Sequence, residues 1–220
     1  SYTENLHFDL KILLVNVGFV PQVGGSYRIL FETISRLPFK KIDVLTSHCI
    51  GEQAFDRLQK IRIIRSSAFS LLDENGTLPP IFPNHPIRQL FFVKLLFKTK
   101  IPFFVAQVLA LIRTLIQIKR ENYDILIAGQ VWTTGYIGWL TKRLYRLPYI
   151  TYILGEEVAS FNKCKKYYEK YLMLRSANNA NSVVAISEAT REEGIKIGIP
   201  KESIVLIYPG VDCEKFRPIV

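Results

Sequence analysis

Residues 181–218 read NSVVAISEATREEGIKIGIPKESIVLIYPGVDCEKFRP, and this stretch gives the clearest indication of the fold class. It opens with a short apolar run at 182–186, continues as a polar segment with helical character over 188–197, and returns to an apolar run at 203–207. Short β-branched runs separated by a helix of this length are typical of parallel strands joined by a crossover helix. The stretch therefore predicts one strand–helix–strand unit of a parallel α/β sheet.

The same alternation extends back to the N-terminus. Apolar runs predict five more strands, at residues 11–17, 42–46, 61–65, 124–128 and 149–154. Helical patterns fall at residues 27–37, 87–99, 103–120, 132–145 and 163–176, and residues 70–86 read as a long proline-containing loop. Repeated strand–helix units of this kind imply a Rossmann-like, right-handed, doubly wound parallel sheet flanked by helices. No linker interrupts the 220 residues, so we expect residues 1–220 to form one domain.

Charge and cysteine content limit the classes of partner and the compartment. Lys and Arg outnumber Asp and Glu by 29 to 19, a net charge of +10, which favours nucleic acid, an acidic membrane surface or a phosphorylated substrate as partner. The three cysteines, Cys49, Cys164 and Cys213, show neither metal-ligand spacing nor a disulfide framework. Residues 1–9 lack the layout of a signal peptide. We therefore expect a cytoplasmic location.

Ligands of doubly wound sheets bind beyond the carboxyl ends of the strands. After the first strand come Gly24 and Gly25, where the backbone can approach a ligand closely and the next helix can offer N–H groups to phosphate. A plain tight turn is the alternative interpretation. The glycines match neither G-x-G-x-x-G nor a P-loop, which argues against a dinucleotide-dependent oxidoreductase.

The C-terminal stretch carries the most specific motifs. Ser187 follows a strand, Gly198-Ile199-Pro200 forms a turn, and Pro209-Gly210-Val211-Asp212 leads into Phe216-Arg217-Pro218. This order resembles the end of the first domain of GT-B glycosyltransferases of the retaining group 1, or family four, type. The resemblance covers residues 10–218.

The resemblance implies a function and a division of labour. The chain would be the N-terminal, acceptor-side half of an enzyme that moves a sugar, with retention, from a nucleoside diphosphate sugar to an acceptor. The C-terminal donor-binding domain would be absent from this chain, so the 220 residues alone are expected to be inactive. No metal and no cofactor besides the sugar nucleotide is expected.

The resemblance also nominates site residues. Gly24 and Gly25 would lie against the donor diphosphate, and Glu156 and Glu157 are the catalytic candidates. The acceptor side of the cleft would be bordered by Tyr27, Gly155, Glu156 and Ser187. Simpler interpretations stay open, because the glutamate pair can be a solvated helix entry and Ser187 a helix cap. Leu154 stands where the family usually has His, and Leu can neither donate a hydrogen bond nor shuttle a proton.

A basic, apolar segment has no counterpart in the motifs above. Residues 75–120 contain no acidic residue but carry Arg88, Lys94, Lys98, Lys100, Arg113, Lys119 and Arg120. Helices over 87–120 could bind an anionic membrane surface. The enzyme would then work at the inner face of the membrane, on a lipid-linked acceptor. The alternative is that these helices simply pack on the sheet. The runner-up function is a non-enzymatic Rossmann-like module that binds an anionic membrane or nucleic acid. No specific nucleic-acid motif is present, so no specific nucleic-acid partner is expected.

Overall fold

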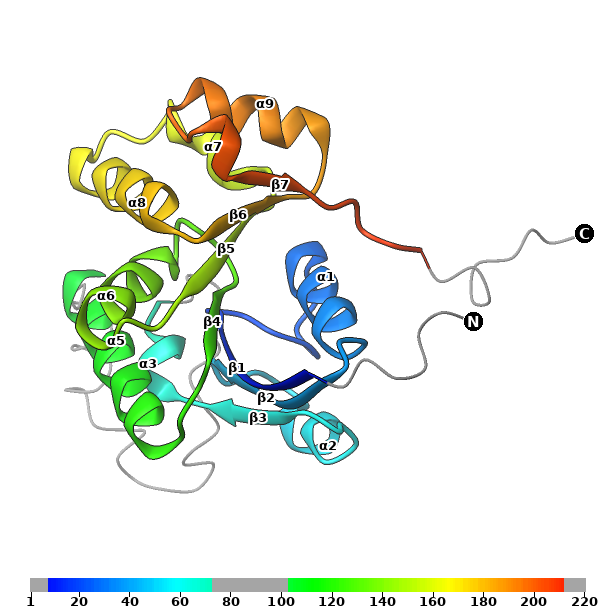
Figure 1. The fold of residues 1–220 in the computed structure, drawn as a ribbon. Helices are drawn as coiled ribbons and strands as arrows, with labels where there is room; N and C mark the ends of the chain where they lie inside the picture. Colours follow the sequence, from blue (N-terminus) through cyan, green and yellow to red (C-terminus); the bar gives the residue numbers. More distant parts are fainter. Residues whose placement is uncertain (1–7, 73–102, 212–220) are drawn as a thin grey trace, which may run out of the picture.

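The structure is a computed structural model that describes residues 8–72 and 103–211. Seven parallel strands form one sheet in the order β3-β2-β1-β4-β5-β6-β7 (Figure 1). The strands are β1 (Phe8–Val15), β2 (Phe39–Thr46), β3 (Arg62–Arg65), β4 (Ile125–Ala128), β5 (Tyr149–Ile153), β6 (Ser182–Ala185) and β7 (Ile204–Leu206). The Rossmann-like, doubly wound sheet predicted from the sequence is confirmed.

Helices cover both faces of the sheet. They are α1 (Gly25–Ile34), α2 (Glu52–Asp56), α3 (Ser67–Ser70), α5 (Phe103–Arg120), α6 (Gly135–Tyr145), α7 (Glu156–Phe161), α8 (Tyr167–Asn179) and α9 (Glu188–Lys196), with a 3₁₀ turn at Lys201–Ser203. Figure 1 shows α5, α6 and α8 along one face and α1 on the opposite face. The crossovers therefore wind in both directions from the centre of the sheet.

The central strand β1 explains why the sheet needs cover on both sides. Leu13 and Val15 are fully buried in the cluster that includes residues of α5 and α6. Ile12 and Leu14 alternate with them and are buried on the other face, against residues of α1. Four consecutive apolar residues, Ile12 to Val15, can bury all their side chains only between two helical layers, as the sequence of this run predicted.

Three expectations for local structure need revision or stay untested. The helix predicted over 163–176 begins later, at Tyr167, and the separate helix α7 before it was not predicted. The short helices α2 and α3 were also missed, because a helix of one turn has too few residues to show a hydrophobic period. The helix predicted over 87–99 and most of the loop predicted over 70–86 lie outside the described residues.

The direction of winding changes between β1 and β4. Leu14 of β1 is paired with Val44 of β2 on one side and with Ile127 of β4 on the other. The chain leaves the carboxyl end of β1 toward one face and the carboxyl end of β4 toward the other. Loops that diverge in this way leave room for a ligand above the strand ends.

Candidate functional site

A pocket of about 360 Å³ lies at this change of winding. Its lining comes from three segments that follow β1, β4 and β5 and include the start of α1 and of α7. The lining residues are Val23, Gly24, Gly25, Ser26, Tyr27, Ile29, Gln130, Leu154 and Glu156. Four residues nominated from the sequence, Gly24, Gly25, Tyr27 and Glu156, are thus brought together around one space.

The first turn of α1 forms one wall of the pocket. Gly24 is the N-cap of the helix, and its carbonyl oxygen accepts a hydrogen bond from the N–H of Arg28 (3.1 Å). The first N–H groups of a helix have no partner within the helix, and the helix dipole places positive charge there. No acidic residue lies in the first turn to compete for those groups. The wall is therefore suited to a phosphate or another anion.

The two glycines of this wall differ in their surroundings. A Cβ built on Gly25 meets no atom within 4 Å, so this backbone faces open space. A Cβ on Gly24 would lie 2.7 Å from Cδ2 of Tyr27, and one on Gly18 would lie 2.3 Å from Cζ of the same ring. The ring of Tyr27 therefore packs between two glycine backbones. Both Gly24 and Gly25 line the pocket, but only at Gly25 would a side chain meet open space.

The glutamate pair after β5 is split by its environment. Glu156 is exposed and lines the pocket, whereas Glu157 is buried. Glu157 Oε2 accepts a hydrogen bond from the N–H of Leu154 (3.1 Å), and its Oε1 has no hydrogen-bond partner among the described residues. Burial raises the pKa of this carboxyl group above its usual value. Of the two catalytic candidates, only Glu156 is placed where it can contact a ligand in the pocket.

Gly155 sets the direction of the chain between Leu154 and α7. Its φ of 108° lies in a region that residues with a Cβ rarely adopt. The turn lets Leu154 and Glu156 both reach the pocket while Glu157 points inward. Gly155 itself is not among the pocket-lining residues, so it acts on the site through the conformation of its neighbours.

Ser187 caps a helix beside this turn. Its Oγ accepts a hydrogen bond from the N–H of Thr190 (3.1 Å) and lies 2.8 Å from Thr190 Oγ1. The helix-cap role predicted for Ser187 is confirmed. Thr190 is also close to Gly155, because a Cβ built on that glycine would lie 3.8 Å from Thr190 Oγ1. Ser187 and Thr190 are both outside the pocket lining, and they lie beside Gly155, whose neighbours Leu154 and Glu156 line the pocket.

Gln130 lines the pocket and was not nominated from the sequence, although it lies just after the predicted strand at 124–128. The side-chain Oε1 of Gln130 accepts a hydrogen bond from Thr133 Oγ1 (3.3 Å), and its backbone carbonyl accepts one from Thr134 Oγ1 (3.0 Å). These contacts hold the loop at the start of α6. A polar residue after a predicted strand is the only signal that could have found it.

Residues 8–72 and 103–211 contain neither a metal-binding cluster nor a membrane-spanning helix. No group of three or more His, Cys, Asp or Glu side chains there is arranged to hold a metal ion. No helix in those ranges has both the length and the hydropathy needed to cross a membrane.

Comparison with known proteins identifies the family. A sequence model of Glycosyltransferase Family 4 matches residues 23–215. The chain belongs to this family. Among curated proteins, no sequence matches it significantly.

Solved structures of this family's fold resemble the chain over nearly all its length. The structure of Anabaena HepE in complex with UDP-glucose is 16% identical, with a TM-score of 0.62 over 93% of this chain and 45% of HepE. Sucrose-phosphate synthase from Thermosynechococcus elongatus is 13% identical, with a TM-score of 0.63 over 96% of this chain and 50% of the synthase. These likenesses establish the fold as the Rossmann-like half of a GT-B glycosyltransferase. The Glycosyltransferase Family 4 chain thus spans about half the length of the proteins it resembles.

Proposed function

We propose that this chain is the acceptor-side half of a retaining glycosyltransferase that moves a sugar from a nucleoside diphosphate sugar to an acceptor. The observation that carries the proposal is the pocket at the N-terminus of α1 in a chain of Glycosyltransferase Family 4. HepE, which shares the fold, has been crystallised with UDP-glucose, which supports a sugar nucleotide as the donor class.

The geometry suggests how the residues share the work. Backbone N–H groups at Gly25 and Ser26 would approach the donor diphosphate, whose charge suits the positive end of α1. Glu156, across the pocket, would accept hydrogen bonds from hydroxyl groups of the acceptor, because an ionised carboxylate is an acceptor only. The transfer would need no metal, since backbone N–H groups supply the positive field at the phosphates.

The remainder of the donor site would be supplied by a second, C-terminal domain. Proteins of this fold are about twice as long as the region they share with this chain. We therefore expect the 220 residues alone to release no nucleotide.

A turnover assay on the complete polypeptide, beside the 220-residue chain, tests the proposal. UDP- and GDP-sugars are offered with a lipid extract, and nucleotide release is followed. Release by the complete polypeptide alone is the expected result. Release by neither protein with any donor would overturn sugar transfer, and release by the 220 residues alone would overturn the division between two domains.

We further propose that the enzyme works in the cytoplasm at the inner face of an anionic membrane, on a lipid-linked acceptor. The observation in favour is an exposed apolar stripe along α5, which we call the α5 stripe. Its members recur on one helical face and are Phe104, Val105, Val108, Leu109, Ile112 and Ile116. Lys119 and Arg120 are exposed at the end of the same helix.

Charge next to the α5 stripe favours an anionic bilayer as the partner. Helix α6 contacts α5 and carries exposed Arg143 in its last turn, with exposed Leu144 and Arg146 beside it. The nearest acidic residue in the sequence, Glu121, is engaged by Lys41 (2.8 Å) and Arg62 (2.9 Å). Apolar side chains flanked by unopposed cations are the combination that binds anionic interfaces.

Vesicle co-sedimentation tests the membrane contact. The chain should bind vesicles that contain phosphatidylglycerol but not vesicles of phosphatidylcholine alone, and Leu109→Ser with Ile112→Ser should weaken the binding. Leu58→Ser is the matched control, because Leu58 is 82% exposed and lies outside the α5 stripe. Equal binding by the double variant and the control would overturn the proposal. Tight binding to DNA of arbitrary sequence would favour the non-enzymatic basic module instead.

A further inference from the structure

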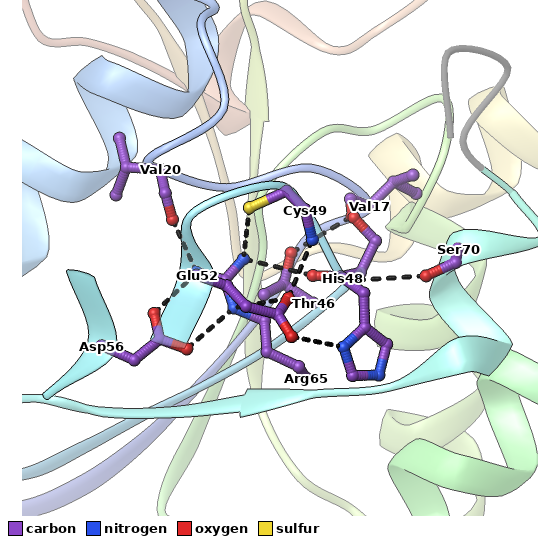
Figure 2. A network of polar contacts seen from close by, with 10 residues as sticks. Val17, Val20, Thr46, His48, Cys49, Glu52, Asp56, Arg65 and Ser70 are labelled. Atoms are coloured by element: carbon purple, nitrogen blue, oxygen red, sulfur yellow. Dashed lines mark hydrogen bonds and ion pairs between the residues drawn. The ribbon is translucent and has the colours of Figure 1, made fainter. Parts of the chain in front are cut away.

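Arg65, the last residue of β3, is a buried cation at the carboxyl edge of the sheet (Figure 2). Its side chain is only 6% exposed. A guanidinium has five N–H donors, and burial of such a group is costly unless those donors are satisfied. The hydrogen-bond partners of Arg65 therefore indicate its structural role.

All five donors have partners, and the partners come from three segments. Nε and Nη2 donate to the two carboxylate oxygens of Asp56 in α2, at 3.0 and 2.7 Å. Nη1 donates to the carbonyl oxygen of Ser47 (3.1 Å) and contacts Cys49 Sγ (3.5 Å), both after β2. Nη2 also donates to the carbonyl oxygen of Val20 at 2.7 Å, after β1. One side chain thus connects the ends of three neighbouring strands.

The segment after β2 is itself held against this cation. Glu52 Oε2 accepts a hydrogen bond from the N–H of Cys49 (2.8 Å) and lies 4.0 Å from Arg65 Nε. Its other oxygen, Oε1, lies 2.8 Å from Nδ1 of His48. In Figure 2 these groups surround the guanidinium, with Asp56 on one side and the turn of His48 and Cys49 on the other. The contacts with Asp56, Ser47 and Cys49 hold the guanidinium in position independently of its bond to Val20.

Val20 is the contact that bears on function. It lies in the loop between β1 and α1, a few residues before Gly24 and Gly25. None of the Arg65 partners lines the pocket, so Arg65 does not touch a ligand there. It contacts Val20, near the start of the loop, whereas the end of the loop, from Val23 on, lines the pocket.

We propose that Arg65 is a positioning residue: by donating to the Val20 carbonyl from a guanidinium fixed by Asp56, it sets the conformation of the glycine loop that receives the donor phosphates. The inference rests on the proposed sugar-nucleotide site. Lysine cannot replace Arg65, since one ammonium group cannot reach the carboxylate in a fork and the Val20 and Ser47 carbonyls together.

The test compares Arg65→Lys with a control that loses a buried hydrogen bond elsewhere. Tyr123→Phe is suitable, because the Tyr123 hydroxyl donates to buried Asp43 and accepts from Gln117 (2.9 Å), away from the pocket lining. Amide hydrogen exchange is measured in both variants at residues 18–26 and in β4, together with thermal unfolding. In the complete polypeptide, KM for UDP-glucose and kcat are measured as well.

In Arg65→Lys we expect exchange at residues 18–26 to rise about tenfold beyond any change in β4, and KM to rise about tenfold with kcat changed much less. Tyr123→Phe should lower the unfolding temperature without either local effect. Exchange at 18–26 that rises no more than in Tyr123→Phe overturns the clamp. Faster exchange with an unchanged KM overturns its role in donor binding. If the unmodified polypeptide transfers no sugar, the proposed function fails, and the exchange measurement still decides whether Arg65 holds the loop.

Discussion

Gly24 and Tyr27 are in direct contact, and a Cβ on Gly24 would lie 2.7 Å from Cδ2 of the tyrosine ring. The ring cannot withdraw, because its other end lies against the backbone of Gly18. We therefore expect Gly24→Ala to lower the free energy of unfolding by about 1–3 kcal/mol, the usual cost of overpacking. Denaturant titration measures this change. An unchanged midpoint would show that the ring has another place to go.

Gly25→Ala should have the opposite profile. The added methyl group meets no atom within 4 Å, so stability should change by less than about 0.5 kcal/mol. The same methyl group lies where the pocket backbone is open, and we expect KM for the sugar-nucleotide donor to rise in the complete polypeptide. Steady-state kinetics beside thermal unfolding measures both. A stable variant with an unaltered KM would remove Gly25 from the donor site.

Ser187→Ala tests the helix cap. Loss of the bond from the Thr190 N–H to Ser187 Oγ should lower the free energy of unfolding by about 1 kcal/mol. Ser187→Asp serves as the control, because aspartate caps helices equally well and adds a charge that suits the helix dipole. Equal losses in both variants would mean that the hydroxyl group has a role other than capping.

The buried carboxyl group of Glu157 predicts a pH dependence of stability. Burial raises its folded-state pKa above the ordinary value of 4.5, so the folded protein holds this proton more tightly than the unfolded chain. The group therefore costs stability at neutral pH, and that cost disappears as the pH falls toward the unfolded value. Glu157→Gln should unfold at a higher temperature than the parent near neutral pH and lose that advantage in acid. A constant difference across the pH series would contradict the assignment.

Leu154→His introduces, at a position that lines the pocket, the residue that the resemblance led us to expect there. An imidazole there can donate a hydrogen bond to the donor sugar, so we expect a lower KM for the donor in the complete polypeptide. Leu154→Asn, which adds a polar group without a ring, is the comparison. If KM rises in both variants, the apolar surface of Leu154 is itself part of the site.

The fold was predictable because the apolar strand sequences are stable only when both faces of the sheet are buried. Alternating residues of β1, such as Leu13 and Leu14, are apolar on both faces and demand two helical layers. The position of the glycine loop was also predictable, because Gly24 and Gly25 stand between a predicted strand and a predicted helix. Local sequence properties were sufficient in both cases.

Other features depended on contacts that exist only in the folded chain. Arg65 is the last residue of a predicted strand, and a charged side chain is usually exposed. Its burial follows from contacts with Asp56 and the Val20 carbonyl, which folding brings to it. The difference between Glu156 and Glu157 depends on the backbone turn at Gly155. The sequence shows a glycine there but not the direction of the turn. Spacing alone could not separate a glutamate in the pocket from a buried one.

Strand β3 is the outermost strand on its side of the sheet, and its last residue contacts the loop at the centre. Sequence changes are usually tolerated at the edge of a sheet. Here they would displace the guanidinium that positions the loop forming the pocket wall. Selection for donor binding should therefore extend to α2 and β3, which contribute no side chain to the pocket. In related chains, Arg65 and Asp56 should be kept or exchanged together.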